Sequence, residues 1–453
     1  MHKTLIIGNH KSLVGKICIN GSKNAILPIM AASLLSDSSV TLFNVPDLVD
    51  VHFMCELLRN FGAEVNFTRN KDYKANHTME ISCDNINYYI APHEIASKLR
   101  ASFLILGPML SKFGKVNTTF PGGCNIGKRP VDMHIKALED MEAKIEIDSY
   151  NITATVNGKL QGREITFEKV SVGATENIIM AATLAEGVTT INNPAIEPEV
   201  LDLIEFLKKM GADINVYSSV IPAHDAEIYD RSQCKTIRMT NSLMEGVITV
   251  KGVEKLNGCT HKIIPDRIEA GTYALAAIIT GGELKLEGVD ISDIKCIEHK
   301  LEAIGANIEA ANDGVIVSRK NNYIKPINVT TNSYPGFPSD MQPQLMSAIC
   351  FADGISIIEE NIFENRFMHV NELKKLGANI NVEKNRAIVT GIKKLSGSNL
   401  HATDLRSTAA LILASLIADG ETIINNSHHY LYRGYEAMYE KLNLCGADIS
   451  VLT

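Results

Sequence analysis

The chain has 453 residues, of which 45% are hydrophobic and 21% are charged, and its formal net charge at pH 7 is -8. This length favours two or more domains, and the composition is typical of a soluble globular protein. The negative charge gives no support to nucleic-acid binding, which normally requires a basic face, but a local cluster of cations could still hold a small anion.

Other features of the sequence argue against membrane, secreted and metal-binding classes. The longest apolar runs, ILPIMAASLL and AALILASLIA, are about half as long as a membrane-spanning helix. The N-terminal residues show no hydrophobic region followed by a small-residue cleavage site, so we expect no secretory signal. The nine cysteines are scattered, odd in number and without a C-x-x-C pair, which favours reduced cytosolic thiols over disulfides or a zinc site. His428 and His429 are adjacent, which is poor spacing for one metal, so we expect no metal site.

Six segments along the chain end on related text: RNFGAEVNF, EDMEAKIEI, KKMGADINV, EAIGANIEA, KKLGANINV and NLCGADISV. Each predicts the end of a helix, a Gly-Ala stop and an alternating strand. Glycine occupies the stop in five of them, and Glu142 takes its place in the second. An earlier helix in each unit, such as ATENIIMAATLAEG, is apolar nearly all round and is therefore expected to be buried. We predict two similar domains, each with three buried helices inside and sheets outside.

The longest interval between stops runs from Gly211 to Gly305, which separates the third unit from the fourth. It contains a weakly periodic stretch, residues 217–246, that carries Pro, Ser and Asp. We interpret this stretch as an insertion near the junction of the two predicted domains.

Cations precede three of the buried helices. In GSKNAILPIMAASLL, Pro28 is expected in the first turn of its helix, which places Lys23 and Asn24 at or just before the N-terminus. Backbone N–H groups and the helix dipole favour an anion there. Arg100 in KLRASFLILGP and Arg406 in DLRSTAALILA occupy equivalent places. A helix-end salt bridge explains any one of these cations, but the three together predict an anion site.

Two loops carry candidate acid and base groups. Asp340 in YPGFPSDMQPQ follows a stiff loop and begins an apolar helix, so it is either an N-cap or a general base held in place. Cys124 in FPGGCNIGKRP lies between two glycines and two cations, an environment that favours the reactive thiolate. Arg129 in the same loop and Arg433 in YRGYEAM are further candidate cations.

Eight segments resemble, in order, signatures of the UDP-N-acetylglucosamine enolpyruvyl transferases: SKNAILP, RASFLILGP, PGGCNIGKRPVDMHIKALE, KVSVGATENIIMAATLAEG, PDRIEAGT, PGFPSDMQPQ, ENRFMHVNELKKLGA and DLRSTAALILASLIADG. The resemblance implies an α/β fold of the EPSP synthase type, with two inside-out α/β barrels of three βαβαββ repeats each and the active site in the cleft between them. Residues 22–263 would form one domain, and residues 1–21 and 264–453 the other.

The resemblance also implies an activity. The enolpyruvyl group of phosphoenolpyruvate would be transferred to the 3'-hydroxyl of UDP-N-acetylglucosamine with release of phosphate, the first committed step of bacterial peptidoglycan synthesis. Cys124 would act as general acid and covalent residue and as the target of fosfomycin, and Asp340 would act as general base. No metal or redox cofactor is expected.

The family's binding residues are carried over by position. Lys23, Arg129 and Arg406 would hold the phosphate and carboxylate of phosphoenolpyruvate, with Arg100 and Arg433 nearby. A further set would line or support the nucleotide-sugar site: Asn24, His134, Lys169, Ser171, Gly173, Glu197, Glu199, Ile362 and Arg366.

Three departures and two alternatives accompany this resemblance. The stretch 217–246 is longer than is usual in the family and could be an added hairpin, a mobile loop or a partner surface. Glu142 replaces a glycine, and Tyr432 stands where the family often has Asp before Arg433. A 5-enolpyruvylshikimate-3-phosphate synthase is disfavoured by the cysteine loop and by SVGATENIIM. A non-catalytic nucleotide-sugar-binding paralogue is disfavoured because the acid, the base and the cations are all retained. We expect a monomeric cytoplasmic protein that binds small-molecule substrates, without nucleic acid and without membrane insertion.

Overall fold

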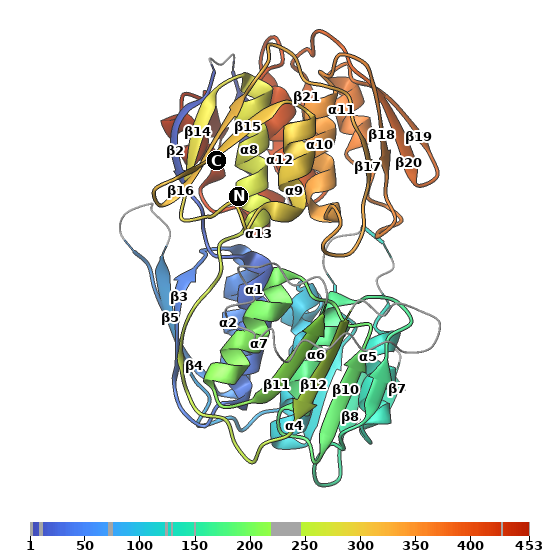
Figure 1. Ribbon diagram of the computed structural model, residues 1–453. Helices are drawn as coiled ribbons and strands as arrows, with labels where there is room; N and C mark the ends of the chain where they lie inside the picture. Colours follow the sequence, from blue (N-terminus) through green and yellow to red (C-terminus); the bar gives the residue numbers. More distant parts are fainter. Residues whose placement is uncertain are drawn as a thin grey trace. The chain divides into compact units, whose positions relative to one another are not determined.

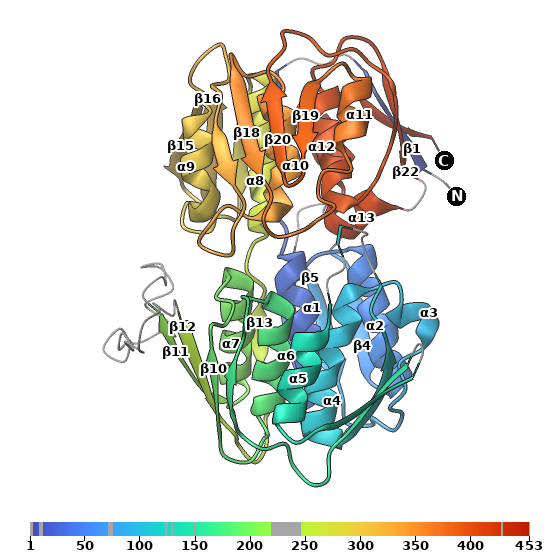
Figure 2. The ribbon, with the colours of Figure 1, turned by 90° about the vertical axis from the view of Figure 1, so that its right-hand side faces the viewer.

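The computed structural model describes residues 3–8, 12–70, 76–122, 126–127, 130–148, 151–218, 246–426 and 429–452. The chain divides into two compact units. Unit 1 comprises Met1–Asn20, Cys124–Arg129 and Pro265–Thr453, and unit 2 comprises Gly21–Gly123 and Pro130–Ile264. In each unit the helices lie inside and the sheets lie along the outside (Figures 1 and 2).

Unit 2 contains three sheets around its helices. One sheet has the order β13 (Thr260–Lys262), β3 (Val40–Val45), β5 (His77–Ser82), β4 (Glu64–Thr68). The second has the order β6 (Lys115–Thr119), β8 (Asn151–Thr155), β7 (Lys144–Asp148). The third has the order β11 (Asp213–Ser218), β12 (Gly246–Lys251), β10 (Val188–Asn192), β9 (Glu164–Thr166).

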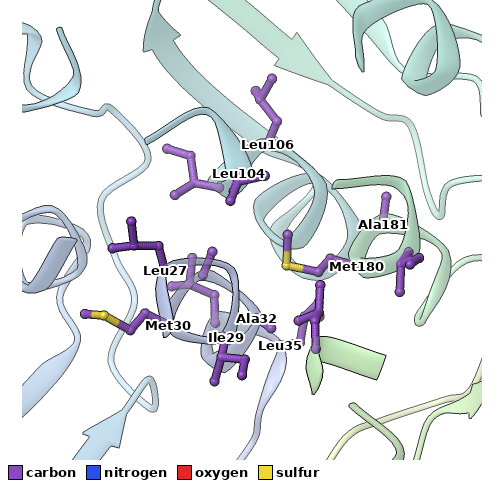
Figure 3. Close-up of a cluster of buried hydrophobic side chains, with 14 of the residues drawn as sticks. Leu27, Ile29, Met30, Ala32, Leu35, Leu104, Leu106, Met180 and Ala181 are labelled. Atoms are coloured by element: carbon purple, nitrogen blue, oxygen red, sulfur yellow. The ribbon is translucent and has the colours of Figure 1, made fainter. Parts of the chain in front are cut away.

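The core of unit 2 is built on three buried helices, α1 (Lys23–Ala32), α4 (Leu106–Phe113) and α6 (Val172–Ala182). The 3-10 helices η1 (Ser33–Leu35) and η2 (Arg100–Ile105) flank these helices. Figure 3 shows apolar side chains of the α-helices and the 3-10 helices gathered in one cluster. The amphipathic helices α2 (Val49–Phe61), α5 (Asp132–Asp140) and α7 (Pro198–Lys209) each bury one face, and α3 spans His93–Ala96.

Unit 1 repeats this plan. Its sheets have the orders β21 (Asn399–His401), β22 (Thr422–Asn426), β1 (Lys3–Ile7), β23 (Ile449–Leu452); β15 (Ala306–Ala311), β16 (Gly314–Arg319), β14 (Glu283–Glu287), β2 (Val14–Cys18); and β17 (Asn328–Thr330), β18 (Ile355–Glu359), β20 (Arg386–Thr390), β19 (Asn379–Glu383). Strands β1 and β2 come from the N-terminus, so the start of the chain completes two of these sheets.

Three buried helices again form the centre of unit 1: α8 (Arg267–Thr280), α10 (Gln342–Ile349) and α12 (Leu405–Ser415). The 3-10 helix η5 (Ser339–Met341) precedes α10. The remaining helices are α9 (Lys295–Ala303), α11 (Val370–Lys375), α13 (Tyr430–Gly434) and α14 (Met438–Leu444). The predicted arrangement of buried helices inside and sheets outside is confirmed.

The six predicted helix stops are present, each with a left-handed residue. Their φ angles are 108° at Gly62, 72° at Glu142, 108° at Gly211, 110° at Gly305, 99° at Gly377 and 103° at Gly446. Glycine adopts this conformation without a steric penalty, whereas a residue with a Cβ is strained in it. Glu142 therefore keeps the stop but carries strain that the five glycines avoid.

Two details of the sequence prediction are wrong. Pro28 is the sixth residue of α1, inside the helix and not in its first turn, although Lys23 does begin the helix. The carbonyl that Pro28 leaves without a helical donor belongs to Asn24, an exposed residue, so water can serve it. Arg100 begins the 3-10 helix η2, and α4 starts only at Leu106.

Two other predictions fall partly outside the described residues. Within the predicted insertion, β11 ends at Ser218 and β12 begins at Gly246, and residues 219–245 lie outside the described part of the chain. His428 also lies outside it. None of the helices that the structure describes has the length and apolar character needed to span a membrane.

Candidate active site

Lys23 begins α1 in unit 2, and its ammonium is paired with a carboxylate. Its Nζ lies 2.8 Å from Oδ2 of Asp50, and the two side chains are 10% and 3% exposed. Asp50 lies in the first turn of α2. The ion pair holds Lys23 beside the N-terminal N–H groups of α1, where a bound anion is favoured. The next residue, Asn24, is exposed.

His134 lies on α5, buried against the elements that carry other predicted site residues. The ring of Phe103 packs edge-on against it at 5.2 Å between centroids. Asn177 Nδ2 donates to His134 Nδ1 at 3.1 Å and also to the Phe103 carbonyl at 3.1 Å. The Gly107 N–H donates to Asn177 Oδ1 at 2.6 Å, which fixes the orientation of the amide. His134 Nδ1 is therefore an acceptor, and the proton of the neutral ring lies on Nε2.

The charge state of His134 is set by its surroundings. Burial, with a smaller contribution from the nearby Arg100 guanidinium, lowers its pKa from 6.5 to about 3. The Arg100 side chain donates from Nη2 to the Pro130 carbonyl at 3.4 Å. His134 is therefore neutral at physiological pH and offers an N–H donor rather than a charge.

The N-terminus of α6 lies beside His134. A Cβ at Gly173 would lie 3.2 Å from His134 Cε1, so glycine leaves room for the ring. Ser171 caps the helix, and its Oγ accepts from the Ala174 N–H at 3.4 Å. Lys169, two residues before the cap, is exposed. The arrangement places N–H donors and a cation at one helix end, which suits an anionic group.

Three carboxylates are grouped around α6 and α7. Glu197 is the N-cap residue of α7, and Glu199 lies in its first turn. Burial raises the pKa of Glu176 on α6 well above its ordinary value, and the charges of Glu199 and Glu197 raise it further. Burial and the two neighbouring carboxylates therefore favour the protonated form of Glu176. The sequence prediction missed Glu176, whose signal was a single acidic residue within an apolar helix.

Asp340 lies in η5 of unit 1 and contacts two arginines. Its Oδ1 accepts from Nη2 of Arg366 at 2.9 Å, and its Oδ2 accepts from Nε of Arg406 at 3.1 Å. Nη2 of Arg406 also lies 3.1 Å from this Oδ2. The arginine side chains are 2% and 1% exposed, whereas that of Asp340 is 30% exposed. The cations are thus buried behind a carboxylate that remains accessible.

Asp404, the N-cap residue of α12, contacts both arginines of this cluster. Its Oδ1 accepts from the N–H groups of Arg406 and Ser407 at 3.0 and 3.1 Å and lies 3.6 Å from Nη1 of Arg366. The guanidinium of Arg406 lies over the Tyr435 ring, 5.4 Å from its centroid. Burial alone would disfavour the charged form of Arg406, but Asp340 raises its pKa above the ordinary value. The cation is therefore retained despite complete burial.

The remaining predicted residues of unit 1 lie near this cluster in sequence. Ile362 is exposed on the turn after β18. His369, which the sequence prediction did not name, is also buried in this unit, and burial lowers its pKa from 6.5 to about 4. Arg433 is half-buried in α13.

Cys124 and Arg129 lie outside the described residues. Of their loop, Ile126 and Gly127 are described, and the Ile126 carbonyl accepts from the Asn365 N–H at 2.9 Å.

The structure thus brings together two sets of predicted residues. In unit 1 these are Asp340, Arg366 and Arg406, and in unit 2 they are His134, Gly173 and Arg100. Within the described ranges, no three His, Cys, Asp or Glu side chains are grouped so as to hold a metal ion.

Comparisons with known proteins place the chain in a family. The model of the EPSP synthase (3-phosphoshikimate 1-carboxyvinyltransferase) family matches residues 7–225 and 236–442, and its gap falls within the predicted insertion. The UDP-N-acetylglucosamine 1-carboxyvinyltransferase of Wolbachia pipientis subsp. Culex pipiens (strain wPip) is 71% identical over 451 residues, covering 100% of both chains. That of Anaplasma marginale (strain St. Maries) is 46% identical and covers 99% of this chain and 98% of its own.

Solved structures share the fold at lower identity. The enolpyruvyl transferase NikO from Streptomyces tendae matches with a TM-score of 0.83 and 23% identity over 100% of this chain and 99% of its own. EPSP synthase from Acinetobacter baumannii matches with a TM-score of 0.71 and 17% identity over 100% of both chains. The predicted α/β fold is confirmed, and the chain belongs to the EPSP synthase family and, within it, to the UDP-N-acetylglucosamine 1-carboxyvinyltransferases, which are transferases.

Proposed function

We propose that this protein transfers the enolpyruvyl group of phosphoenolpyruvate to the 3'-hydroxyl of UDP-N-acetylglucosamine and releases phosphate. The full-length identity of 71% to a relative of that name supports the choice of substrates. The observation that carries the chemistry is the accessible carboxylate of Asp340, fixed on two buried guanidiniums. A general base needs this combination of fixed orientation and access to the substrate.

The reaction has two steps. In the first, the sugar oxygen forms a bond to C2 of phosphoenolpyruvate, the hydroxyl proton passes to a base, and a proton adds to the methylene carbon. In the second, the methyl carbon returns a proton and the bond between C2 and the phosphate oxygen breaks. We assign the base to Asp340 and the acid, with any covalent adduct, to Cys124. Each proton transfer of this kind typically contributes about 10²- to 10⁴-fold to the rate.

Cations would neutralise phosphoenolpyruvate and the departing phosphate. We assign this role to Lys23, Arg129 and Arg406, with Arg100 and Arg433 in support. Lys23 is suited because Asp50 holds its ammonium at the N-terminus of α1. Charge-assisted hydrogen bonds from such groups are strong and act on the oxygens where negative charge develops.

The nucleotide sugar would be bound by the second predicted set of residues. The N-terminus of α6, with Ser171, Gly173 and the nearby Lys169, offers donors to an anionic group. His134 adds a neutral N–H donor. The other members of the set are Asn24, Glu197, Glu199, Ile362 and Arg366.

The proposed cellular setting follows from this reaction. We place the protein in the bacterial cytoplasm as a monomer that supplies peptidoglycan synthesis, and so cell-wall formation, cell shape and division. Among the residues that the structure describes, no cysteine forms a disulfide, which fits a reducing compartment.

The role of Cys124 is tested with fosfomycin, an epoxide that a reactive thiolate would open. Mass spectrometry of the treated wild-type protein should find one adduct on Cys124, and the Cys124→Ser variant should show none. Burial raises the pKa of the Cys83 and Cys350 thiols to about 12, so these serve as internal controls that remain unmodified. A persistent adduct on the Cys124→Ser variant would overturn the assignment.

A further inference from the structure

A buried carboxylate, Glu360, joins two loops of unit 1 that carry proposed site residues. Glu360 follows β18 and is 3% exposed. Its Oε2 accepts from the Ser339 hydroxyl at 2.9 Å. Its Oε1 accepts from the backbone N–H groups of Ile362 and Phe363 at 2.9 and 3.1 Å. One side chain therefore holds the loop before α10 and the turn after β18 at the same time.

The contact with Ser339 bears directly on Asp340, the next residue in the chain. The carbonyl of Ser339 accepts from Nε of Arg366 at 3.2 Å, while its hydroxyl donates to Glu360. The backbone and the side chain of Ser339 are thus held from two sides. The peptide that carries Asp340 has its position fixed by these contacts as well as by the arginines that bind the carboxylate itself.

Glu360 is well placed to serve as an anchor. Its backbone N–H donates to the Asn385 carbonyl at 2.8 Å, which ties it to the turn between β19 and β20. Its carboxylate accepts three hydrogen bonds, and bonds to an ionised acceptor are about twice as strong as those between neutral groups. Three residues after Phe363, the chain reaches Arg366, which itself donates to Asp340.

We propose that Glu360 is a positioning residue that fixes the Ser339–Asp340 peptide relative to the turn carrying Ile362 and Arg366. This inference rests on the proposed function, in which Asp340 acts as the base. Groups that orient the ligands of metal sites typically change activity by about 10- to 100-fold when removed, and we expect the same range for Glu360, which is likewise one contact away from the reacting group. Glu360 itself exchanges no proton with the substrate, so its removal should affect kcat more than the KM for phosphoenolpyruvate.

The conservative variant separates positioning from charge. In Glu360→Gln, the amide oxygen can still accept from the two backbone N–H groups, and the amide nitrogen can donate to the Ser339 hydroxyl. We expect kcat to fall about 10- to 100-fold in Glu360→Ala and to stay within about threefold of wild type in Glu360→Gln, with the KM for phosphoenolpyruvate within about threefold in both. Glu359→Ala is the matched control, because Glu359 is adjacent and its carboxylate accepts a 3.3 Å hydrogen bond from the exposed Thr330 hydroxyl, away from the Ser339 loop.

A double variant tests whether Glu360 acts through Asp340. If it does, Glu360→Ala should cause no further loss of kcat in an Asp340→Asn background, because the group it positions is already gone. Independent, multiplicative losses would overturn the proposal, as would wild-type kcat in folded Glu360→Ala. If Glu360→Ala does not fold, Ser339→Ala removes only the hydroxyl link and should lower kcat about 3- to 10-fold, and an unchanged kcat there would equally overturn it.

A failure of the proposed function can be distinguished from a failure of the Glu360 inference by the activity of the wild-type protein. Wild-type protein that releases no phosphate with UDP-N-acetylglucosamine would overturn that function directly. The Glu360 link is then measured by a double-mutant cycle of Glu360→Ala and Ser339→Ala in urea unfolding. A coupling there supports the anchor, and additive effects on stability overturn it.

Discussion

Asp340 accepts a 2.9 Å hydrogen bond at Oδ1 from Nη2 of Arg366, a side chain that is 2% exposed. The carboxylate is 30% exposed, so the buried member of the pair is the cation. This differs from an ordinary surface salt bridge, in which both partners are solvated. A substrate can reach the carboxylate without uncovering the guanidinium that orients it.

Asp340→Asn should therefore abolish most of the activity. The amide cannot take up the hydroxyl proton, so we expect kcat/KM to fall about 10²- to 10⁴-fold in a phosphate-release assay. Asp353→Asn is the control, because Asp353 is exposed and lies in the turn between α10 and β18. Activity of Asp340→Asn within about threefold of wild type would contradict the base assignment.

The Lys23–Asp50 pair should show the behaviour of a buried ion pair in unfolding experiments. Asp50→Ala leaves the Lys23 ammonium uncompensated, and we expect the free energy of unfolding to fall by about 3–5 kcal/mol. Adding Lys23→Met removes the unpaired charge, so the double variant should be more stable than Asp50→Ala alone. Urea titrations of the three proteins measure both effects. A double variant less stable than Asp50→Ala would contradict the pairing.

The lowered pKa of His134 leads us to predict that the stability of the protein depends on pH. Its pKa is about 3 in the folded protein and 6.5 in the unfolded chain, so below pH 6.5 the unfolded chain takes up a proton that the folded protein does not. Stability is therefore lost as the pH falls, by about 2 kcal/mol from this group between pH 7 and pH 5.

Replacing the ring should remove that contribution. The difference in unfolding free energy between wild type and His134→Gln should be smaller at pH 5 than at pH 7 by about 2 kcal/mol. His299→Gln is the control, because the His299 side chain is 73% exposed. Equal differences for His134→Gln at both pH values would show that His134 titrates normally in the folded protein.

The left-handed conformation of Glu142 leads us to predict that glycine at this position stabilises the protein. Its φ of 72° is strained for a residue with a Cβ, and its ion pair with Arg163 joins two largely exposed side chains. Surface pairs of this kind contribute about 0–1 kcal/mol, whereas the left-handed conformation costs roughly 1–2 kcal/mol. We expect Glu142→Gly to raise the free energy of unfolding by about 0.5–1 kcal/mol.

The equivalent glycine of the third repeat is the matched test. A Cβ at Gly211 would meet nothing within 4 Å, so Gly211→Ala introduces strain at φ 108° without a steric clash. It should lower the free energy of unfolding by about 1–2 kcal/mol. Thermal unfolding of both variants checks the prediction, and it fails if the two substitutions change stability in the same direction.

The repeats could be predicted from the sequence because each is encoded locally. A helix stop such as Gly377 needs a left-handed residue followed by an alternating strand, and both signals lie within a few residues. The error at Pro28 came from the same local rule. Proline is disfavoured inside a helix, but here the freed carbonyl belongs to an exposed residue, so the helix continues through it.

The site was only partly predictable. Lys23, Asp340 and Arg406 were identified because a charged residue at the start of a buried helix is conspicuous in the sequence. Asp50 and Glu360 were missed, because their roles depend on contacts between segments that are distant along the chain. A buried carboxylate that accepts backbone and hydroxyl donors has no sequence pattern of its own, so only the folded chain shows it.

The most direct test of the proposed function is phosphate release from phosphoenolpyruvate by the purified protein, with UDP-N-acetylglucosamine or shikimate-3-phosphate offered in parallel, with and without fosfomycin. We predict release with the nucleotide sugar alone, blocked by the epoxide. Release with shikimate-3-phosphate alone, or no release with either acceptor, would contradict the proposed function.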